Sequence, residues 1–362
     1  MSTLSTLSVK NPLVPDFEIR IDGSSLPVDF KTRLVRLVVD DDTTIPSMFT
    51  LEFADLAEKD KPQIKPNLSV DESLFDLGNE VEIKLGYKGK LKSLIVGEIT
   101  GLDADFTAQR PPCLTVRGYD RRHRLQRGRK TRTFVKQKDS DIATQIAREA
   151  KLSPRTKDSR VIHDYLFQAN QTDMEFLQAR AQQIQYELVV EKKTLLFRPV
   201  SNSRRATVTL TLNDDLLEFH PLLSSAGQAS EVSVRGWDPK NKKAIVGKAN
   251  AGDEVSRMGG RQAAAAIAKQ TFGKAAIALD DWPVLTQAEA DQQAKAYFNR
   301  AALTLIEGDG LCRGRADLRA GQMIEIEGVG QRFSGQYYVA RAIHRYSQSG
   351  YYTQFQVRRN AS

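Results

Sequence analysis

The sequence has few of the residues that mark disulfide-stapled, metal-binding or membrane-spanning proteins. Its 362 residues include two cysteines, Cys113 and Cys312, and four histidines. The cysteines form no CxxC pair and so indicate no disulfide framework. No two histidines have the i, i+3 or i, i+4 spacing of a helical metal site. Because no apolar run approaches the roughly 20 residues that cross a bilayer, we expect no metal, no cofactor and no direct membrane insertion.

Catalytic motifs are also missing. The sequence contains neither a GxSxG nucleophile elbow nor a GxxxxGK[ST] phosphate loop. The glycine clusters at 308–314 and 328–335 lead into strand-like segments, so they present no helix N-terminus to a phosphate. None of the 45 acidic residues stands out as half of a hydrolytic carboxylate pair. These absences indicate a non-enzymatic protein.

The first residues of the chain show no basic cluster followed by an apolar block, the pattern of a secretion signal. We therefore expect no secretory signal, and the two unpaired cysteines favour synthesis in a reducing compartment. Its length and its 40% share of hydrophobic residues predict a large core divided among two or three domains.

Positive charge is plentiful and unevenly distributed. The formal net charge is +8, and Asp120 is the only acidic residue between 117 and 136. Such a block can bind phosphate groups, or it can be a solvated connector, or a charged wall that faces the lumen or a neighbouring subunit of an assembly. Few aromatic residues lie beside it to stack on bases. This candidate basic segment contains Arg121, Arg122, Arg124, Arg127, Arg129, Lys130 and Arg132.

Short alternating segments dominate both ends of the chain. Residues 17–120 hold several of them, such as FEIRIDG and EVEIKLG, with Gly, Asp and Pro between them. This pattern is typical of an antiparallel barrel or sandwich, and it returns at 200–238 and 302–362. The sequence thus predicts a mainly β fold with α+β insertions.

Helical patterns interrupt the strands twice. Thr172 and Glu175 have the spacing of a capping box, and so do Thr286 and Glu289. Helices are also predicted over 140–150 and before Gly273. The resulting division is an N-terminal arm at 1–16, a first β-barrel at 17–120, an α+β domain at 121–199, a second β-barrel at 200–238 and 302–362, and a helical insertion at 239–301.

The two β regions have similar sequence patterns. GNEVEI at 78–83 matches GQMIEI at 321–326. Each is followed by a glycine-containing turn, a long alternating strand and a final strand, which is 114–118 in one region and 355–359 in the other. Because the order and spacing of several segments agree, the pattern favours an internal duplication and predicts two pseudo-repeated antiparallel β-barrels.

A second likeness joins LTVRGYD at 114–120 and VSVRGWD at 232–238. We interpret it as two similar exits from the barrels, since the repeat partner of the first strand lies at the C-terminus. At each exit the glycine would break the strand, the aromatic side chain would cover the barrel rim and the aspartate would start a turn. The candidate exit residues are Gly118, Tyr119, Asp120, Gly236, Trp237 and Asp238.

The ordered set of segments resembles a known family. It runs from Phe17 through VRGYDRRHRLQRGRKTRTF, QANQTDMEFLQARAQQIQYELVVEKKTLLFRP and VSVRGWDPKNK to GQMIEIEGVGQRFSGQYYVARAIHRYS, and ends near Asn360. This order is similar to the late control protein D family of contractile-tailed phages. It is also similar to the hub part of the valine-glycine-repeat spike proteins of injection systems.

The resemblance implies a trimeric baseplate hub. Two barrels in each subunit would form a ring of six that joins a six-fold inner tube to a three-fold spike around an axial conduit. The implied partners are two further copies of the chain, a spike protein, a tube or tube-initiator protein and other baseplate proteins, with nucleic acid only as passing cargo. Since no spike barrel or needle follows the last strand, we expect the spike either to be a separate chain or to belong to a further part of a longer protein. The resemblance also implies assembly in the bacterial cytoplasm and a final location in a phage tail or a phage-tail-like injection particle.

Two other functions stay open at the level of the sequence. One is a nucleic-acid-binding module that uses residues 117–136, which would bind less tightly as salt rises. The other is a cell-wall hydrolase, which would turn over peptidoglycan.

Overall fold

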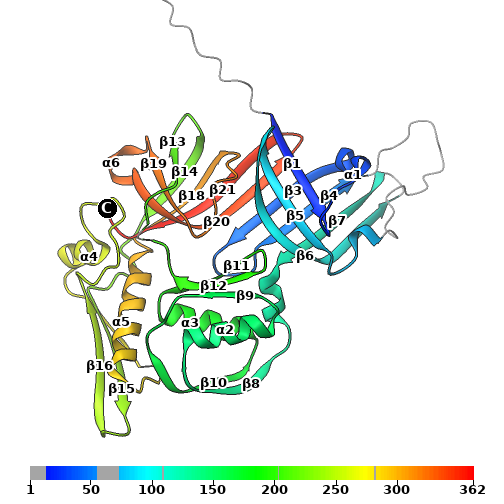
Figure 1. The fold of residues 1–362 in the computed structure, drawn as a ribbon. Helices are drawn as coiled ribbons and strands as arrows, with labels where there is room; N and C mark the ends of the chain where they lie inside the picture. Colours follow the sequence, from blue (N-terminus) through cyan, green and yellow to red (C-terminus); the bar gives the residue numbers. More distant parts are fainter. Residues whose placement is uncertain (1–13, 55–72, 108–109, 203, 281–282) are drawn as a thin grey trace, which may run out of the picture.

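The computed structural model describes residues 14–54, 73–107, 110–202, 204–280 and 283–362 (Figure 1). Its largest element is a 13-stranded sheet with the order β14-β18-β21-β20-β3-β4-β7-β6-β5-β1-β2, in which β19 joins β20 and β13 joins β19. Two three-stranded sheets and one two-stranded sheet complete the strand pairing of the described residues. The predicted mainly β fold, with antiparallel strand pairing throughout most of the large sheet, is confirmed.

The 13-stranded sheet consists of two halves with the same arrangement. In the first half, β1, β3, β4, β5, β6 and β7 lie in the spatial order β3-β4-β7-β6-β5-β1. In the second, β13, β14, β18, β19, β20 and β21 lie in the order β14-β18-β21-β20-β19-β13. The halves differ at one place, because β1 is antiparallel to β5 whereas β13 is parallel to β19. The strands are β1 (Pro15–Ile21), β3 (Leu34–Asp42), β4 (Met48–Ala54), β5 (Glu80–Tyr87), β6 (Lys90–Thr107), β7 (Arg110–Asp120), β13 (Val208–Thr211), β14 (Leu216–Leu223), β18 (Ile306–Arg313), β19 (Met323–Glu327), β20 (Gly335–Ser347) and β21 (Gly350–Arg359).

Each half has its own apolar core, built from the alternating inward side chains that the sequence predicts. Leu37, Phe49 and Val116 are fully buried in the first half, and Ile324 and Phe355 are fully buried in the second. The chain segments between these strands also contain four short elements. They are β2 (Ser24–Ser25), α1 (Val28–Arg33), the 3-10 helix Ser73–Phe75 and α6 (Gly330–Phe333).

The α+β unit, residues 121–199, lies below the middle of the sheet in Figure 1. After the 3-10 helix Arg121–Gln126 it contains β8 (Lys130–Lys138), α2 (Asp139–Glu149), β9 (Ser153–Thr156), β10 (Ile162–Gln171), α3 (Asp173–Gln183), β11 (Tyr186–Glu191) and β12 (Thr194–Pro199). The predicted capping box of α3 is present, because the Thr172 hydroxyl accepts from the Glu175 N–H at 3.1 Å and the Glu175 carboxylate accepts from the Thr172 N–H at 2.8 Å.

A second excursion leaves the sheet between β14 and β18. It contains β15 (Glu231–Asp238), β16 (Lys243–Asn250), α4 (Ala264–Phe272), β17 (Ala276–Leu279) and α5 (Gln287–Ala302). Helix α4 ends at Gly273, as predicted, with a φ of 85° that favours glycine. The sequence placed the β15 segment in the second barrel, but β15 pairs with β16 and β17 in a separate sheet. Alternation shows that a segment is a strand, but it does not specify the pairing partner.

Candidate functional site

The basic segment is largely neutralised by carboxylates of the same chain. Six of its seven side chains form ion pairs, and Arg127 is the exception within the described residues. Arg124, for example, lies 2.6 Å from Glu98, and Arg132 lies 2.7 Å from Asp173. Burial raises the pKa of Glu98, but hydrogen bonds from Arg124 and His123 outweigh it and hold the pKa below its ordinary value. The segment therefore offers much less free positive charge to a phosphate than its composition indicates.

Arg122 is the most enclosed member of the segment and is completely buried. Its Nε donates to Asp120 at 2.8 Å, and one Nη donates to the Asp42 carbonyl and to the Ser47 hydroxyl, both at 2.9 Å. The other Nη lies 3.4 Å from the Leu188 carbonyl of β11. One guanidinium thus ties the α+β unit to two strands of the first half.

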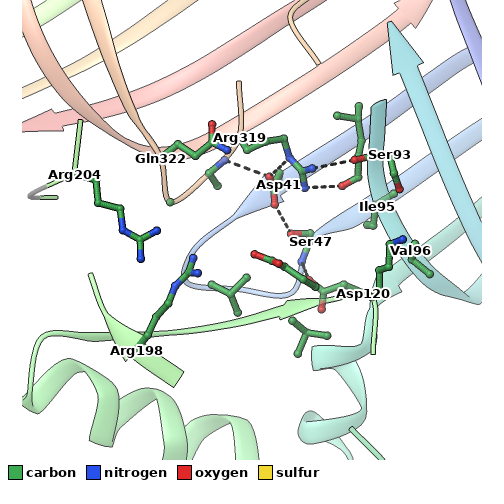
Figure 2. Close-up of a pocket in the computed structure, with 17 residues that line it drawn as sticks. Asp41, Ser47, Ser93, Ile95, Val96, Asp120, Arg198, Arg204, Arg319 and Gln322 are labelled. Carbon is green, nitrogen blue, oxygen red and sulfur yellow. Dashed lines mark hydrogen bonds and ion pairs between the residues drawn. The ribbon is translucent and has the colours of Figure 1, made fainter. Parts of the chain in front are cut away.

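Asp41 continues this network toward the second half. It accepts from the Ser47 hydroxyl at 3.0 Å and from Arg319 Nε at 2.7 Å, while Arg319 also donates to the Ser93 and Leu94 carbonyls. Burial raises the pKa of Asp41, but the Arg319 guanidinium outweighs it and keeps the pKa lowered. Figure 2 shows Asp41 between Ser47 and Arg319, where strands of both halves meet.

A cavity of about 360 Å³ opens beside this network (Figure 2). The β11–β12 turn, β6 and the loop before β19 line it, and Arg198 and Arg204 extend toward each other at its side. Arg198 donates its Nε to Glu187 at 2.7 Å, and Glu187 also accepts from the Tyr338 hydroxyl of β20 at 3.0 Å. Guanidinium groups fit an oxyanion rather than a metal cation. Among the described residues no group of three or more His, Cys, Asp or Glu side chains could hold a metal ion.

The exit residues lie in two different surroundings. Gly118 and Gly236 do not end their strands, because both have paired neighbours on either side. A Cβ at Gly118 would lie 2.2 Å from the Glu98 carbonyl oxygen, and one at Gly236 would lie 2.4 Å from the Val284 carbonyl oxygen. Both glycines therefore permit close backbone approach, which differs from the strand-breaking role expected from the sequence.

The aromatic and acidic exit residues also differ from one site to the other. Tyr119 is half-buried, but Trp237 is 54% exposed and lies in the separate sheet of β15. Asp120 accepts from the Arg122 N–H at 2.8 Å and starts a 3-10 helix. Asp238 is the last residue of β15 and accepts from the Lys240 N–H of the following turn at 3.0 Å.

Sequence reasoning missed a buried polar cluster between the two insertions. His163 Nδ1 lies 2.5 Å from Glu289 of α5, and its Nε2 lies 3.1 Å from Asp139 of α2. Arg180 of α3 donates to Asp139 at 2.6 Å. Burial lowers the pKa of His163, but the two carboxylates outweigh it and raise the pKa above 6.5. Nothing in the spacing of these residues signals that they meet, since 126 positions separate His163 from Glu289.

Solved structures with this fold are phage tail proteins and a related secretion component. The 43 kDa tail protein of prophage MuSo2 from Shewanella oneidensis is 12% identical, with a TM-score of 0.70 over 95% of this chain and 98% of that chain. A tail protein from Neisseria meningitidis MC58 is also 12% identical, with a TM-score of 0.67 over 95% of this chain and 96% of that chain. The E. coli c3393 protein, a component of the type VI secretion system, is 13% identical, with a TM-score of 0.60 over 95% and 77% of the two chains.

The chain therefore shares the fold of these proteins. The family model described as "Alg8 N-terminal domain" matches residues 12–348, and the chain belongs to that family. No curated protein matches the sequence. Within the described residues, no helix is long and apolar enough to cross a membrane.

Proposed function

We propose that the chain is the non-enzymatic central hub of a contractile tail or related injection-system baseplate. The observation that carries this proposal is the likeness of fold to a prophage tail protein along nearly the whole of both chains. The late control protein D resemblance, which rests on the order of segments in the sequence, supports the same function. The hub would work mechanically, as a clamp between an inner tube and a spike with an axial conduit for cargo.

The internal repeat supports a role as a symmetry adaptor. Two halves with the same strand order lie in each chain, so three chains would present six similar units to a six-fold tube and three identical faces to a spike. We propose that each half closes as a barrel and that 1–16, 121–199 and an insertion between β14 and β18 are separate arms or domains. Residues 1–13 of the N-terminal arm lie outside the described residues.

Exposed apolar side chains on the α+β unit support contacts with other baseplate proteins. Val135, Tyr165 and Phe167 of the β8–β10 sheet are 57%, 53% and 48% exposed, and the two aromatic rings stack 6.4 Å apart. Exposed apolar patches of this kind mark protein interaction sites. The proposed partners are two further copies of the chain, a separate spike chain, a tube or tube-initiator protein and neighbouring baseplate proteins. Assembly would take place in the bacterial cytoplasm, and the product would be a virion tail or an injection particle.

The ion pairs of the basic segment argue against the nucleic-acid-binding alternative. Its carboxylate partners belong to the same chain, so a phosphate would have to displace them. Nucleic acid remains in the proposal only as cargo.

Particle imaging and light scattering test the hub proposal. The purified protein should have three times the 40.5 kDa mass of the chain and form a three-fold ring with an axial hole. A protein that stays monomeric at micromolar concentration, and does not assemble when tube or spike protein is added, would contradict the proposal.

A further inference from the structure

The cavity beside Asp41 lies where three parts of the chain meet (Figure 2). Strand β6 of the first half, the loop before β19 in the second half and the β11–β12 turn of the α+β unit all line it. Its volume of about 360 Å³ is at the small end of the roughly 300–1,000 Å³ that is typical of ligand pockets. The cavity is therefore large enough for a small ligand, and the hub function proposed above makes no use of it.

Arg198 of β12 reaches this cavity in a fixed orientation. Its Nε donates to Glu187 at 2.7 Å, and Glu187 also accepts from the Tyr338 hydroxyl at 3.0 Å. The Glu187 side chain is only 3% exposed, so this carboxylate is a rigid support for the guanidinium. Because Glu187 engages only the Nε, the two Nη groups of Arg198 have no hydrogen-bond partner among the described residues. They remain available to a ligand.

Arg204 brings a second guanidinium to the same place. It lies in the segment before β13 and is exposed, and its side chain has neither a hydrogen bond nor an ion pair within the described residues. Figure 2 shows the Arg198 and Arg204 side chains extending toward each other. Like charges repel, so this convergence becomes favourable when an anion lies between the two groups. The planar forks of guanidinium N–H donors match the paired oxygen atoms of a phosphate.

The charge of the cavity lining also favours an anion. Its two buried carboxylates, Asp41 and Asp120, already accept hydrogen bonds from other arginines. Arg204 and Lys192 have no ion pair in the described part of the chain, and the same holds for the exposed Glu191. Two unpaired cations thus stand against one unpaired carboxylate. The basic segment at 121–132 differs, because carboxylates of the same chain neutralise most of it.

We propose that this cavity binds a phosphate group between Arg198 and Arg204, with Lys192 as a third cation. The group is either free inorganic phosphate or the phosphate of a small monoester, whose organic part would contact the buried apolar side chains Ile95 and Val190 of the lining. The bound anion would join the α+β unit, which carries Arg198, to the segment that leads into the second half. The site lies within one chain and does not depend on the hub proposal.

Calorimetric titration of the full chain tests the proposal. In a phosphate-free buffer at constant ionic strength, sodium phosphate and glycerol 3-phosphate should bind saturably, whereas sodium chloride should not. Tighter binding of the ester would support a small phosphorylated molecule as the source of the group, and equal or weaker binding would support free phosphate. If the dicarboxylate succinate binds as tightly as phosphate, the assignment of a phosphate site is overturned.

Arg204→Gln locates the binding site. Since Arg204 is exposed and has no partner among the described residues, its loss should leave the fold intact. It should weaken phosphate binding about tenfold or more, because it removes charge-assisted hydrogen bonds. Arg205→Gln is the matched control: Arg205 is the exposed neighbour of Arg204 and is not part of the cavity lining, so the affinity should stay unchanged.

Glu191→Gln provides a control of opposite sign. It removes the unpaired carboxylate of the lining and should tighten phosphate binding, an effect that general destabilisation would not produce. Thermal unfolding gives a second readout, because a ligand that binds the folded state raises the Tm. Phosphate should raise the Tm of the natural protein and of Arg205→Gln more than that of Arg204→Gln.

Two results would overturn the inference. One is the absence of saturable phosphate binding by the natural protein. The other is equal phosphate affinity of Arg204→Gln and Arg205→Gln, which would place the bound anion elsewhere on the chain. Both results leave the hub proposal standing, since that proposal rests on the fold and is tested by the mass and shape of the assembly.

Discussion

At the scale of the residue, Arg122 shows how one buried charge can hold three parts of the molecule together. It is completely buried and bonds to Asp120, to Ser47 and to backbone carbonyls of β3 and β11. Replacing it with methionine would keep its volume but leave Asp120 buried without its cation. We expect Arg122→Met to lower the free energy of unfolding by about 3–5 kcal/mol, measured by urea denaturation.

Arg127 is the matched control for this prediction. It lies in the same segment, is exposed, and its side chain has no carboxylate partner among the described residues. Arg127→Met should change stability by less than about 0.5 kcal/mol. Equal effects of the two substitutions would contradict a special role for the buried guanidinium.

His344 predicts a loss of stability in acid. Burial lowers its pKa to about 3, and Arg319 acts in the same direction, whereas the ordinary value is 6.5. The imidazole is neutral in the folded protein but takes up a proton in the unfolded chain below about pH 6.5. Because the unfolded state then binds more protons, the free energy of unfolding should fall by up to about 1.4 kcal/mol per pH unit between pH 6.5 and 3.

A non-titrating variant isolates this contribution. His344→Gln should make unfolding stability less dependent on pH between 6.5 and 4.5, by about 1 kcal/mol per unit relative to the natural protein. The exposed His220, replaced in the same way, should leave the slope unchanged. Identical slopes for the natural protein and His344→Gln would exclude His344 as the source of the acid sensitivity.

The sequence alone indicates little of this residue-level chemistry. A run of arginines is normally solvated, so the pattern around Arg122 predicts an exposed basic patch. Apart from Asp120, the carboxylates that neutralise this segment lie far from it in the chain. Glu98 and Glu80, for example, come from strands of the first half. Pairing over such distances depends on the completed fold.

At the scale of the element, the His163 cluster connects the two insertions. The His163 imidazole lies between Glu289 of α5 and Asp139 of α2, with Arg180 of α3 beside it. Since the folded pKa is raised, this contribution to stability is complete below about pH 6.5 and is lost as pH rises through the folded pKa. His163→Asn should release α5 from the α+β unit at a cost of about 1–3 kcal/mol.

Hydrogen exchange measures that release. Amides of Gln287–Ala302 should exchange faster in His163→Asn, while strands of the first half stay unchanged, and His220→Asn should have no effect. The difference between natural protein and variant should shrink as pH rises, after correction for intrinsic exchange rates. A uniform increase across the whole chain would instead indicate general destabilisation.

Elements were largely predictable because their signals are local. The capping residues Thr172 and Thr286 and the terminal Gly273 mark the observed helix boundaries. Strand partners were less predictable. As expected, the repeat partner of LTVRGYD is the C-terminal strand. However, the equivalent bulges in the β6–β7 and β20–β21 ladders align 114–118 with 353–357, whereas the sequence analysis matched 114–118 with 355–359. The separate sheet of β15 was not expected, since the same alternation suits either sheet.

At the scale of the whole molecule, the repeat explains where the second excursion is inserted. β3 and β4 are joined by the short segment 43–47, whereas their equivalents β14 and β18 are separated by a much longer one. Leu223 and Ile306 are direct partners in the β14–β18 ladder, and the Ser224 N–H donates to the Leu305 carbonyl at 2.9 Å. The excursion therefore leaves and re-enters the sheet at one point, as an elongated hairpin loop.

This geometry predicts that the excursion can be removed. A variant in which a short glycine-containing turn replaces residues 225–304 should retain the 13-stranded sheet, because every strand of that sheet lies outside the deleted segment. It should be less stable, since Arg359 loses its bond to the Met258 carbonyl and His163 loses Glu289. Circular dichroism, urea denaturation and light scattering would measure this.

Deletion of 122–199 is the contrasting variant, and it should not fold, because it removes Arg122 and Glu187, which tie the α+β unit to both halves. Equal tolerance of both deletions would show that the two halves associate without the α+β unit, through the pairing of β3 with β20 and the contacts of Arg319 with Asp41 and β6.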